Sequence, residues 1–131
     1  RPLLSYAALE RTVDEAGGVQ LGYVLRDAGG VLVDRKVVGY GGAEEDANYV
    51  ALIYGLLKAL EKGVEDVVVR GSSVEVTMQL SGRWKPRRRA QSVLNSTATE
   101  LMSYFTSRLE TSLENEARDL VAESLGIVQT T

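Results

Sequence analysis

The sequence contains no cysteine and no histidine among its 131 residues. The absence of cysteine excludes a disulfide framework and thiol chemistry. The absence of histidine removes the most common general base and the most common metal ligand. Any hydrolysis would therefore have to rest on carboxylates and a hard cation. No apolar run is long enough to span a bilayer and no signal-peptide pattern opens the chain, so we expect a cytoplasmic protein without membrane contact.

The length and composition are those of one folded domain. Hydrophobic residues make up 44% of the chain and charged residues 25%, which is ordinary for a globular protein with one buried core. We therefore expect residues 1–131 to form a single domain.

The net charge of -3 gives no overall attraction to nucleic acid, so only a local basic patch could bind it. The chain begins at Arg1, and we expect it to be a piece of a longer parent protein.

Three strands joined by glycine-rich turns are predicted near the start of the chain. Residues 4–13 are apolar-rich and end at a turn signal over residues 14–18. Residues 19–26 and 31–39 are typical strands, separated by a tight turn at 27–30. This spacing predicts an antiparallel meander.

The hydrophobic period then changes to that of a helix. Apolar residues recur at helical spacing from Tyr49 to Leu60, and Gly63 follows as a C-terminal stop. Three consecutive valines within residues 64–70 indicate a buried strand. A helix between two strands predicts that at least one strand pair is parallel. The remaining predicted elements are a helix at 72–80, a basic turn at 82–89, a helix at 91–105, a strand at 106–113 and a helix at 114–125.

The predicted order is β-β-β-α-β-α-α-β-α, an α/β fold whose mixed five-stranded sheet is flanked by helices. This order is the topology of type 1 ribonucleases H, and four segments resemble that family over roughly residues 20–125. Residues 47–56 (ANYVALIYGL) resemble its A-E-Y-x-A-L-x-x-G-L helix, and residues 69–73 (VRGSS) its V-x-G-D-S strand end. Residues 79–85 (QLSGRWK) match Q-x-x-G-x-W-K, and residues 115–122 (NEARDLVA) resemble the closing N-x-x-A-D-x-L-A.

The resemblance implies a catalytic set of four acidic residues around two divalent cations. Carried over to this chain, the helix glutamate corresponds to Asn48 and the strand-end aspartate to Ser72. Only the last aspartate is kept, as Asp119. The family's first aspartate lies in a D-G-x-S pattern before a glycine- and proline-rich loop; both are absent here, and Glu10 is the only acid nearby. Because divalent cations depend on ligand charge, we predict a catalytically degenerate domain without a metal cofactor.

Other positions near this set also differ from the family. Asparagines that contact the minor groove of an RNA·DNA hybrid usually precede the helix, whereas Glu44 and Glu45 stand there in this chain and would repel phosphates. The same glutamates suit the positive end of a helix. We interpret Tyr6, near the former metal site, as filling the vacated space. We interpret Asp119 as an early-helix residue that bonds local backbone groups.

The basic turn surrounds Trp84 and Pro86 with five cations in seven residues: Arg83, Lys85, Arg87, Arg88 and Arg89. These cations could hold a phosphate backbone, with Trp84 as a stacking surface. In the alternative interpretation the turn is a solvated loop, Trp84 packs against the short helix, and the arginines pair with the many acids.

Three functions remain open from the sequence. The first is a non-catalytic ribonuclease-H-like module, a pseudoenzyme with a binding or scaffolding role inside a larger protein or assembly. The second is an active ribonuclease H that cleaves the RNA strand of hybrids with Mg²⁺ or Mn²⁺ through a rearranged site using Glu10, Asp119 and Glu75. The third is a protein that binds nucleic acid through the basic turn without cutting it.

Overall fold

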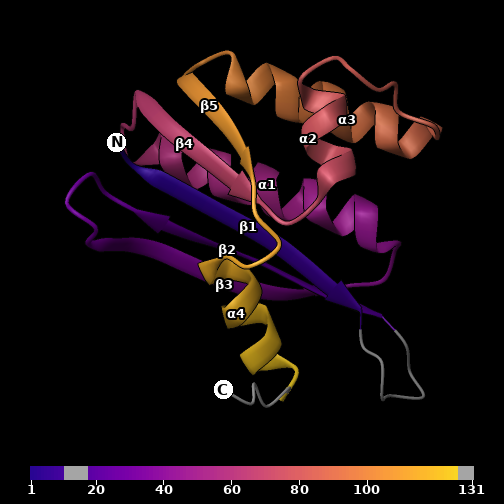
Figure 1. Ribbon diagram of the computed structural model, residues 1–131, viewed down its shortest axis with the longest axis horizontal. Helices are drawn as coiled ribbons and strands as arrows, with labels where there is room; N and C mark the ends of the chain where they lie inside the picture. Colours follow the sequence, from indigo (N-terminus) through magenta and orange to yellow (C-terminus); the bar gives the residue numbers. More distant parts are fainter. Residues whose placement is uncertain (11–17, 127–131) are drawn as a thin grey trace.

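A computed structural model describes residues 1–10 and 18–126. Its elements follow the predicted order (Figure 1). They are β1 (Leu3–Glu10), β2 (Val19–Arg26), β3 (Leu32–Tyr40), α1 (Glu44–Glu61), β4 (Asp66–Gly71), α2 (Val74–Leu80), α3 (Arg89–Met102), β5 (Thr106–Thr111) and α4 (Glu116–Ser124).

The five strands form one sheet in the order β3-β2-β1-β4-β5. β2 pairs antiparallel with both β1 and β3, which confirms the predicted meander. β4 pairs parallel with both β1 and β5. The parallel β1–β4 pair is possible because α1 crosses over the sheet between β3 and β4. The mixed sheet predicted from the sequence is therefore confirmed.

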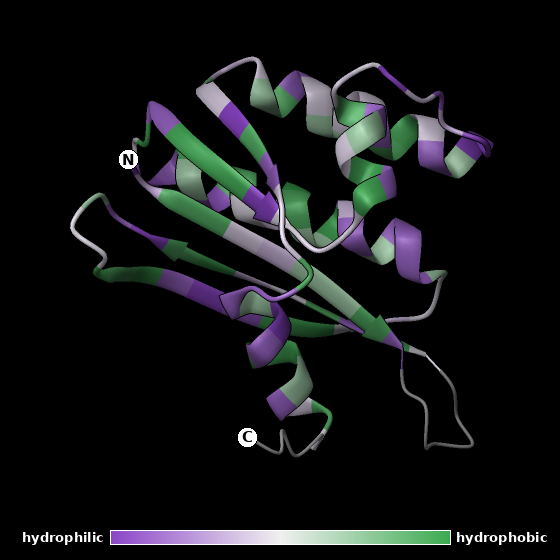
Figure 2. Cartoon of the chain, viewed as in Figure 1, coloured by the Kyte–Doolittle hydropathy of each residue, from purple (hydrophilic) through white to green (hydrophobic). Residues whose placement is uncertain are grey.

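Helices cover both faces of the sheet, with α1 on one face and α4 on the other (Figure 1). The alternation of side chains along β1 divides the core between them. Leu4, Tyr6 and Ala8 belong to the large cluster on the α1 side. Ala7 belongs to a small cluster with Ala117 of α4. Figure 2 shows that β1 and β4 are mainly hydrophobic, whereas β5 and α4 carry more hydrophilic residues.

The buried face of α1 differs in part from the predicted stripe. The apolar stripe predicted that all leucines of this helix face the core. Leu52 and Leu56 are fully buried as expected, but Leu57 and Leu60 are 48% and 38% exposed, so the prediction is wrong for these two. The face turned to the sheet is lined by small residues instead. A Cβ atom on Gly55 would lie 2.4 Å from Leu4 Cδ1, so this helix approaches β1 more closely than a side chain would allow.

Local signals place most helix ends. Gly63 follows α1 with a φ of 77°, a conformation that favours glycine. Ser73 caps α2 by accepting a hydrogen bond from Val76 N (3.1 Å). α4 begins later than predicted, at Glu116, because Asn115 is its cap and accepts from Arg118 N (2.9 Å).

Other boundaries also shift by a few residues. β5 ends at Thr111 rather than at residue 113, α2 begins at Val74 rather than at residue 72, and α3 spans Arg89–Met102 rather than residues 91–105. The predicted extension of the first strand to residue 13 and most of the following turn lie outside the described residues. Within the described part of the chain, no helix is both long enough and apolar enough to cross a membrane.

Candidate functional site

Three of the four segments that resemble the ribonuclease H motifs, 47–56, 69–73 and 115–122, lie close to the middle of β1, next to the end of β4. Tyr6 of β1 lies opposite Gly71 of β4 in the parallel register, and Ser72 follows directly. Asn115, the cap of α4, donates to the carbonyl oxygen of Tyr6 (3.4 Å). Glu45, in the first turn of α1, is close enough to act electrostatically on the Tyr6 hydroxyl. The fold thus joins residues that lie more than a hundred positions apart in the sequence.

Tyr6 occupies the place in β1 that faces the strand end preceding Ser72. The side chain is 1% exposed. A Cβ atom on Gly71 would lie 2.1 Å from Tyr6 Cζ, so the ring fills all the space beside this strand end. This packing agrees with the interpretation of Tyr6 as a space-filling residue. Glu10 lies at the far end of β1, opposite Val19.

The Tyr6 hydroxyl is buried and has no hydrogen-bond partner among the described residues. Thr77 is the nearest polar side chain; its hydroxyl donates to the Ser73 carbonyl oxygen (3.1 Å) and accepts from Thr111 (2.9 Å), which leaves it one acceptor site. Burial raises the pKa of Tyr6 far above its ordinary value and Thr77 lowers this pKa by less, so the group stays a neutral phenol at neutral pH. It therefore offers no negative charge to a cation.

Asn48 is also neutral and buried, with 3% of its surface exposed. Its amide nitrogen donates to the Glu44 carbonyl oxygen (3.1 Å), one turn earlier in α1. Its Oδ1 atom has no partner within the described chain. A neutral amide and a neutral phenol cannot replace the charge of two carboxylates, so these residues do not fit a pair of divalent cations.

Acidic residues do lie near the start of α1, but they are held by other contacts. Glu45 accepts from Ser73 Oγ (3.0 Å). Burial raises the pKa of Glu45, the Ser73 hydrogen bond lowers it, and the nearby Glu75 raises it. Burial also raises the pKa of Glu44, with a further contribution from Glu10. Within residues 1–10 and 18–126, no group of three or more acidic side chains is placed to hold a metal ion.

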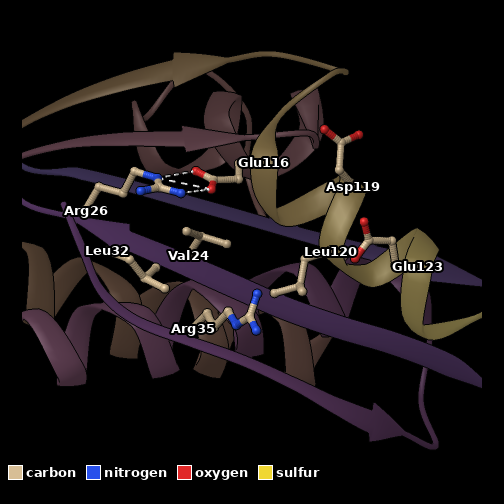
Figure 3. Close-up of a pocket in the computed structure, with 8 residues that line it drawn as sticks. All are labelled: Val24, Arg26, Leu32, Arg35, Glu116, Asp119, Leu120 and Glu123. Atoms are coloured by element: carbon tan, nitrogen blue, oxygen red, sulfur yellow. Dashed lines mark hydrogen bonds and ion pairs between the residues drawn. The ribbon is translucent and has the colours of Figure 1, made fainter. Parts of the chain in front are cut away.

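Asp119 lies on α4, on the face of the sheet opposite α1, and is exposed. It lines a pocket of about 160 Å³ between α4 and the β2–β3 hairpin (Figure 3). The apolar floor of this pocket consists of Val24, Leu32 and Leu120. Figure 3 shows the Asp119 carboxylate directed away from the Arg26–Glu116 pair on the pocket wall.

The Arg26–Glu116 pair joins β2 to the first turn of α4. Arg26 Nε donates to both carboxylate oxygens of Glu116, at 3.0 and 2.8 Å, and the terminal nitrogen makes a further contact. This pairing lowers the pKa of Glu116. The bidentate geometry fixes the position of α4 on the sheet.

A buried polar network links three helices on the α1 side of the sheet. The Tyr49 hydroxyl donates to Gln79 Oε1 (2.6 Å) and accepts from Asn95 Nδ2 (3.0 Å). Gln79 Nε2 donates to Gln91 Oε1 (3.0 Å), which also accepts from the backbone N of Arg87 (2.9 Å). The sequence patterns did not predict this network. Its only signal was the pair Gln91 and Asn95, which interrupts the apolar stripe of α3 at helical spacing.

The basic turn is held by its backbone and presents its side chains to solvent. Arg83, Trp84, Lys85, Arg87 and Arg89 are exposed, and Trp84 is 45% exposed. Arg88 instead forms a bidentate ion pair with the buried Asp46 at 3.0 and 2.5 Å. The interpretation of arginines paired with acids therefore applies to Arg88.

The sheet order and helix placement define a ribonuclease-H-like fold. The ribonuclease H1 from Halobacterium salinarum is 26% identical, with a TM-score of 0.76 over 95% of this chain and 93% of that chain. The N-terminal ribonuclease H domain of a Mycobacterium tuberculosis protein is 25% identical, with a TM-score of 0.71 and coverages of 94% and 95%. LC11-RNase H1, solved in complex with an RNA/DNA hybrid, is 18% identical, with a TM-score of 0.81 and coverages of 96% and 97%.

The family assignment follows from the sequence as well. The model of the reverse transcriptase-like family matches residues 10–125. The chain therefore belongs to the reverse transcriptase-like family and has the fold of type 1 ribonucleases H. No curated protein sequence matches it.

Replacement of Tyr6 by phenylalanine tests the unpartnered hydroxyl. Because a buried hydroxyl without a hydrogen bond is destabilising, we expect Tyr6→Phe to leave the free energy of unfolding unchanged or to raise it by about 1 kcal/mol. Tyr49→Phe is the matched control, since its hydroxyl makes two hydrogen bonds, and it should lose about 1–3 kcal/mol. Urea unfolding followed by circular dichroism measures both. A loss in Tyr6→Phe as large as that in Tyr49→Phe would contradict this account.

Replacement of Glu45 and of Glu116 by glutamine should change stability in opposite directions. The folded pKa of Glu45 is raised, so its charge costs stability at neutral pH, and this cost disappears as the pH falls through the raised pKa towards about 4.3. The folded pKa of Glu116 is lowered, so its contribution is present at neutral pH and is lost as the pH falls below about 4.3.

At neutral pH we therefore expect Glu45→Gln to be more stable than the parent and Glu116→Gln to be less stable, the latter by less than about 1 kcal/mol because the pair is partly exposed. Urea midpoints at neutral pH and at about pH 3 measure both changes. The two differences should shrink in acid, and equal signs at neutral pH would show that the assigned shifts are wrong.

Proposed function

We propose that this chain is a non-catalytic ribonuclease-H-like module with a binding or scaffolding role. The observation that carries the proposal is the neutral, close-packed Tyr6 ring beside Gly71, where the end of β4 lies against the middle of β1. At the two positions that match the family's helix glutamate and strand-end aspartate, the neutral side chains of Asn48 and Ser72 stand instead. The loss of charge at three separate positions supports a change of role for the whole site.

The chemistry of the family explains why these changes matter. Two divalent cations activate a water and stabilise the leaving oxygen of a phosphodiester, and they need several carboxylates to offset the loss of their hydration shells. Asp119 is the one carboxylate retained from the family pattern, and a single carboxylate does not supply this charge. No metal cofactor is therefore part of the proposal.

The alternative of an active ribonuclease H with a rearranged site has less support. Its three acids would be Glu10 at the end of β1, Glu75 on α2 and Asp119 on α4. Glu75 already accepts from Gln79 Nε2 (3.3 Å), and no metal-holding acidic group occurs within the described residues. LC11-RNase H1 was solved with an RNA/DNA hybrid, but Glu44 and Glu45 of this chain would face such a substrate with negative charge.

The extent of the domain, its partners and its location in the cell are part of the same proposal. We take residues 1–131 as one domain, supported by a structural match that covers 95% of the chain. A parent protein or a protein partner would give a non-catalytic module its role, and one relative is the N-terminal domain of a longer protein. The absence of cysteine agrees with a cytoplasmic location.

A cleavage assay tests the proposal. The purified chain and its Asp119→Asn variant are incubated with a labelled RNA·DNA hybrid and either Mg²⁺ or Mn²⁺, with the ribonuclease H1 from Halobacterium salinarum as the positive control. Because the site lacks the charge to hold two cations, we expect no metal-dependent cleavage by either form. Metal-dependent cleavage that disappears in Asp119→Asn would overturn the proposal and establish the rearranged site.

A further inference from the structure

The basic turn is built as a rigid platform. Gly82 turns the chain with a φ of 79°. The backbone nitrogens of Arg83 and Trp84 both donate to the Met78 carbonyl oxygen, at 2.9 and 3.2 Å, so the turn folds back on the end of α2. At its other end, the backbone nitrogen of Arg87 donates to the buried side chain of Gln91 (2.9 Å). Both ends are therefore fixed by hydrogen bonds before any ligand arrives.

The side chains of this platform point away from the core. Among the five cations of the turn, only Arg88 forms an ion pair within residues 1–10 and 18–126, with Asp46. The other four, Arg83, Lys85, Arg87 and Arg89, are exposed and carry their charge into solvent. Figure 2 shows the hydrophilic tip of this segment between α2 and α3, away from α4 and the β2–β3 hairpin. Because the backbone of the turn is held by hydrogen bonds, these four cations stay close together. They form a local positive field on a chain whose net charge is -3.

Trp84 adds a flat aromatic surface to this field. It is the only tryptophan of the chain, and 45% of its surface is exposed although its backbone is fixed. An exposed indole between cations matches the way proteins hold single-stranded nucleic acid, in which bases stack on aromatic rings while basic side chains follow the phosphates. A duplex hides the faces of its bases within the stack, so it cannot use this surface along its length.

The surroundings of the turn also disfavour a rigid duplex. Arg88 is bound to Asp46 in the first turn of α1, which places the acidic start of that helix next to the platform. A duplex that lay on the turn and crossed towards α1 would bring phosphates near Glu44 and Glu45. A flexible single strand can follow the turn alone.

We infer that the basic turn is a binding site for single-stranded nucleic acid, in which Trp84 stacks on an unpaired base and Arg83, Lys85, Arg87 and Arg89 contact phosphates. This inference deepens the proposed function and rests on it in one respect, namely that the bound strand is held and not cut. Both RNA and DNA strands present the recognised groups, which are unpaired bases and phosphates.

The fluorescence of Trp84 gives a direct test, because no other tryptophan contributes to the signal. We expect a twelve-nucleotide oligo(U) or oligo(dT) to quench it with saturation at low salt. Fluorescein-labelled strands, a duplex and an RNA·DNA hybrid of the same length are then compared by anisotropy, and the single strands should bind at least about tenfold more tightly. Absence of quenching by both single strands, or tighter binding of the hybrid, would overturn the inference.

Variants separate stacking from charge. Trp84→Ala should weaken single-strand binding about tenfold, whereas Tyr104→Ala, which removes another exposed aromatic residue, should not. Four phosphate contacts at about 0.7 each predict a slope of about -2.8 for log K against log salt, and Arg87→Gln with Arg89→Gln should reduce it to about -1.4. Arg35→Gln with Lys62→Gln removes the same charge elsewhere and should leave the slope unchanged. An equal effect of the two charge pairs would reject the site.

The integrity of the oligonucleotides after binding keeps the two proposals apart. Cleaved strands on a denaturing gel would contradict the non-catalytic function and leave the binding site standing. Intact strands without quenching would reject the binding site and leave the non-catalytic function standing.

Discussion

The contact between Tyr6 and Gly71 is the constraint on which the site depends. It lies where the central strand β1 runs parallel to β4, and the ring occupies space that a single added carbon on Gly71 would already overlap. An aromatic ring here packs the core of the sheet, whereas an acidic group at the same place would need cations or hydrogen bonds to be stable. The packed Tyr6 ring therefore adds to the core of the sheet and brings no charge to this part of it.

A separate buried network on the α1 side of the sheet anchors the basic turn. The network of Tyr49, Gln79 and Gln91 begins one residue after Asn48 in α1 and ends at the backbone of Arg87. Buried hydrogen bonds that are all satisfied specify one geometry, because each broken bond would leave a polar group without a partner. The same packed helices that enclose the former site thus fix the turn that carries Trp84.

The order of elements, the capping serine Ser73 and the stop at Gly63 could be predicted from the sequence because they depend on neighbouring residues. The burial of α1 could not be predicted fully, since Gly55 rather than Leu57 faces the sheet, and that choice depends on Leu4 in a distant strand. The place of Tyr6 required the register between β1 and β4, which no local pattern contains. The exposure of Asp119 depends on how α4 docks through Glu116 and Arg26.

The central claim is that packing of Tyr6 leaves no place for divalent cations between β1, β4 and α1. A crystal of the protein soaked in Mn²⁺ tests this claim most directly, because anomalous scattering locates the ion without reference to activity. The account predicts an unchanged Tyr6 ring against Gly71 and no manganese peak beside Tyr6, Asn48 or Ser72. A manganese ion bound by Asn48 or Ser72, with the Tyr6 ring rotated out of its packed position, would contradict it.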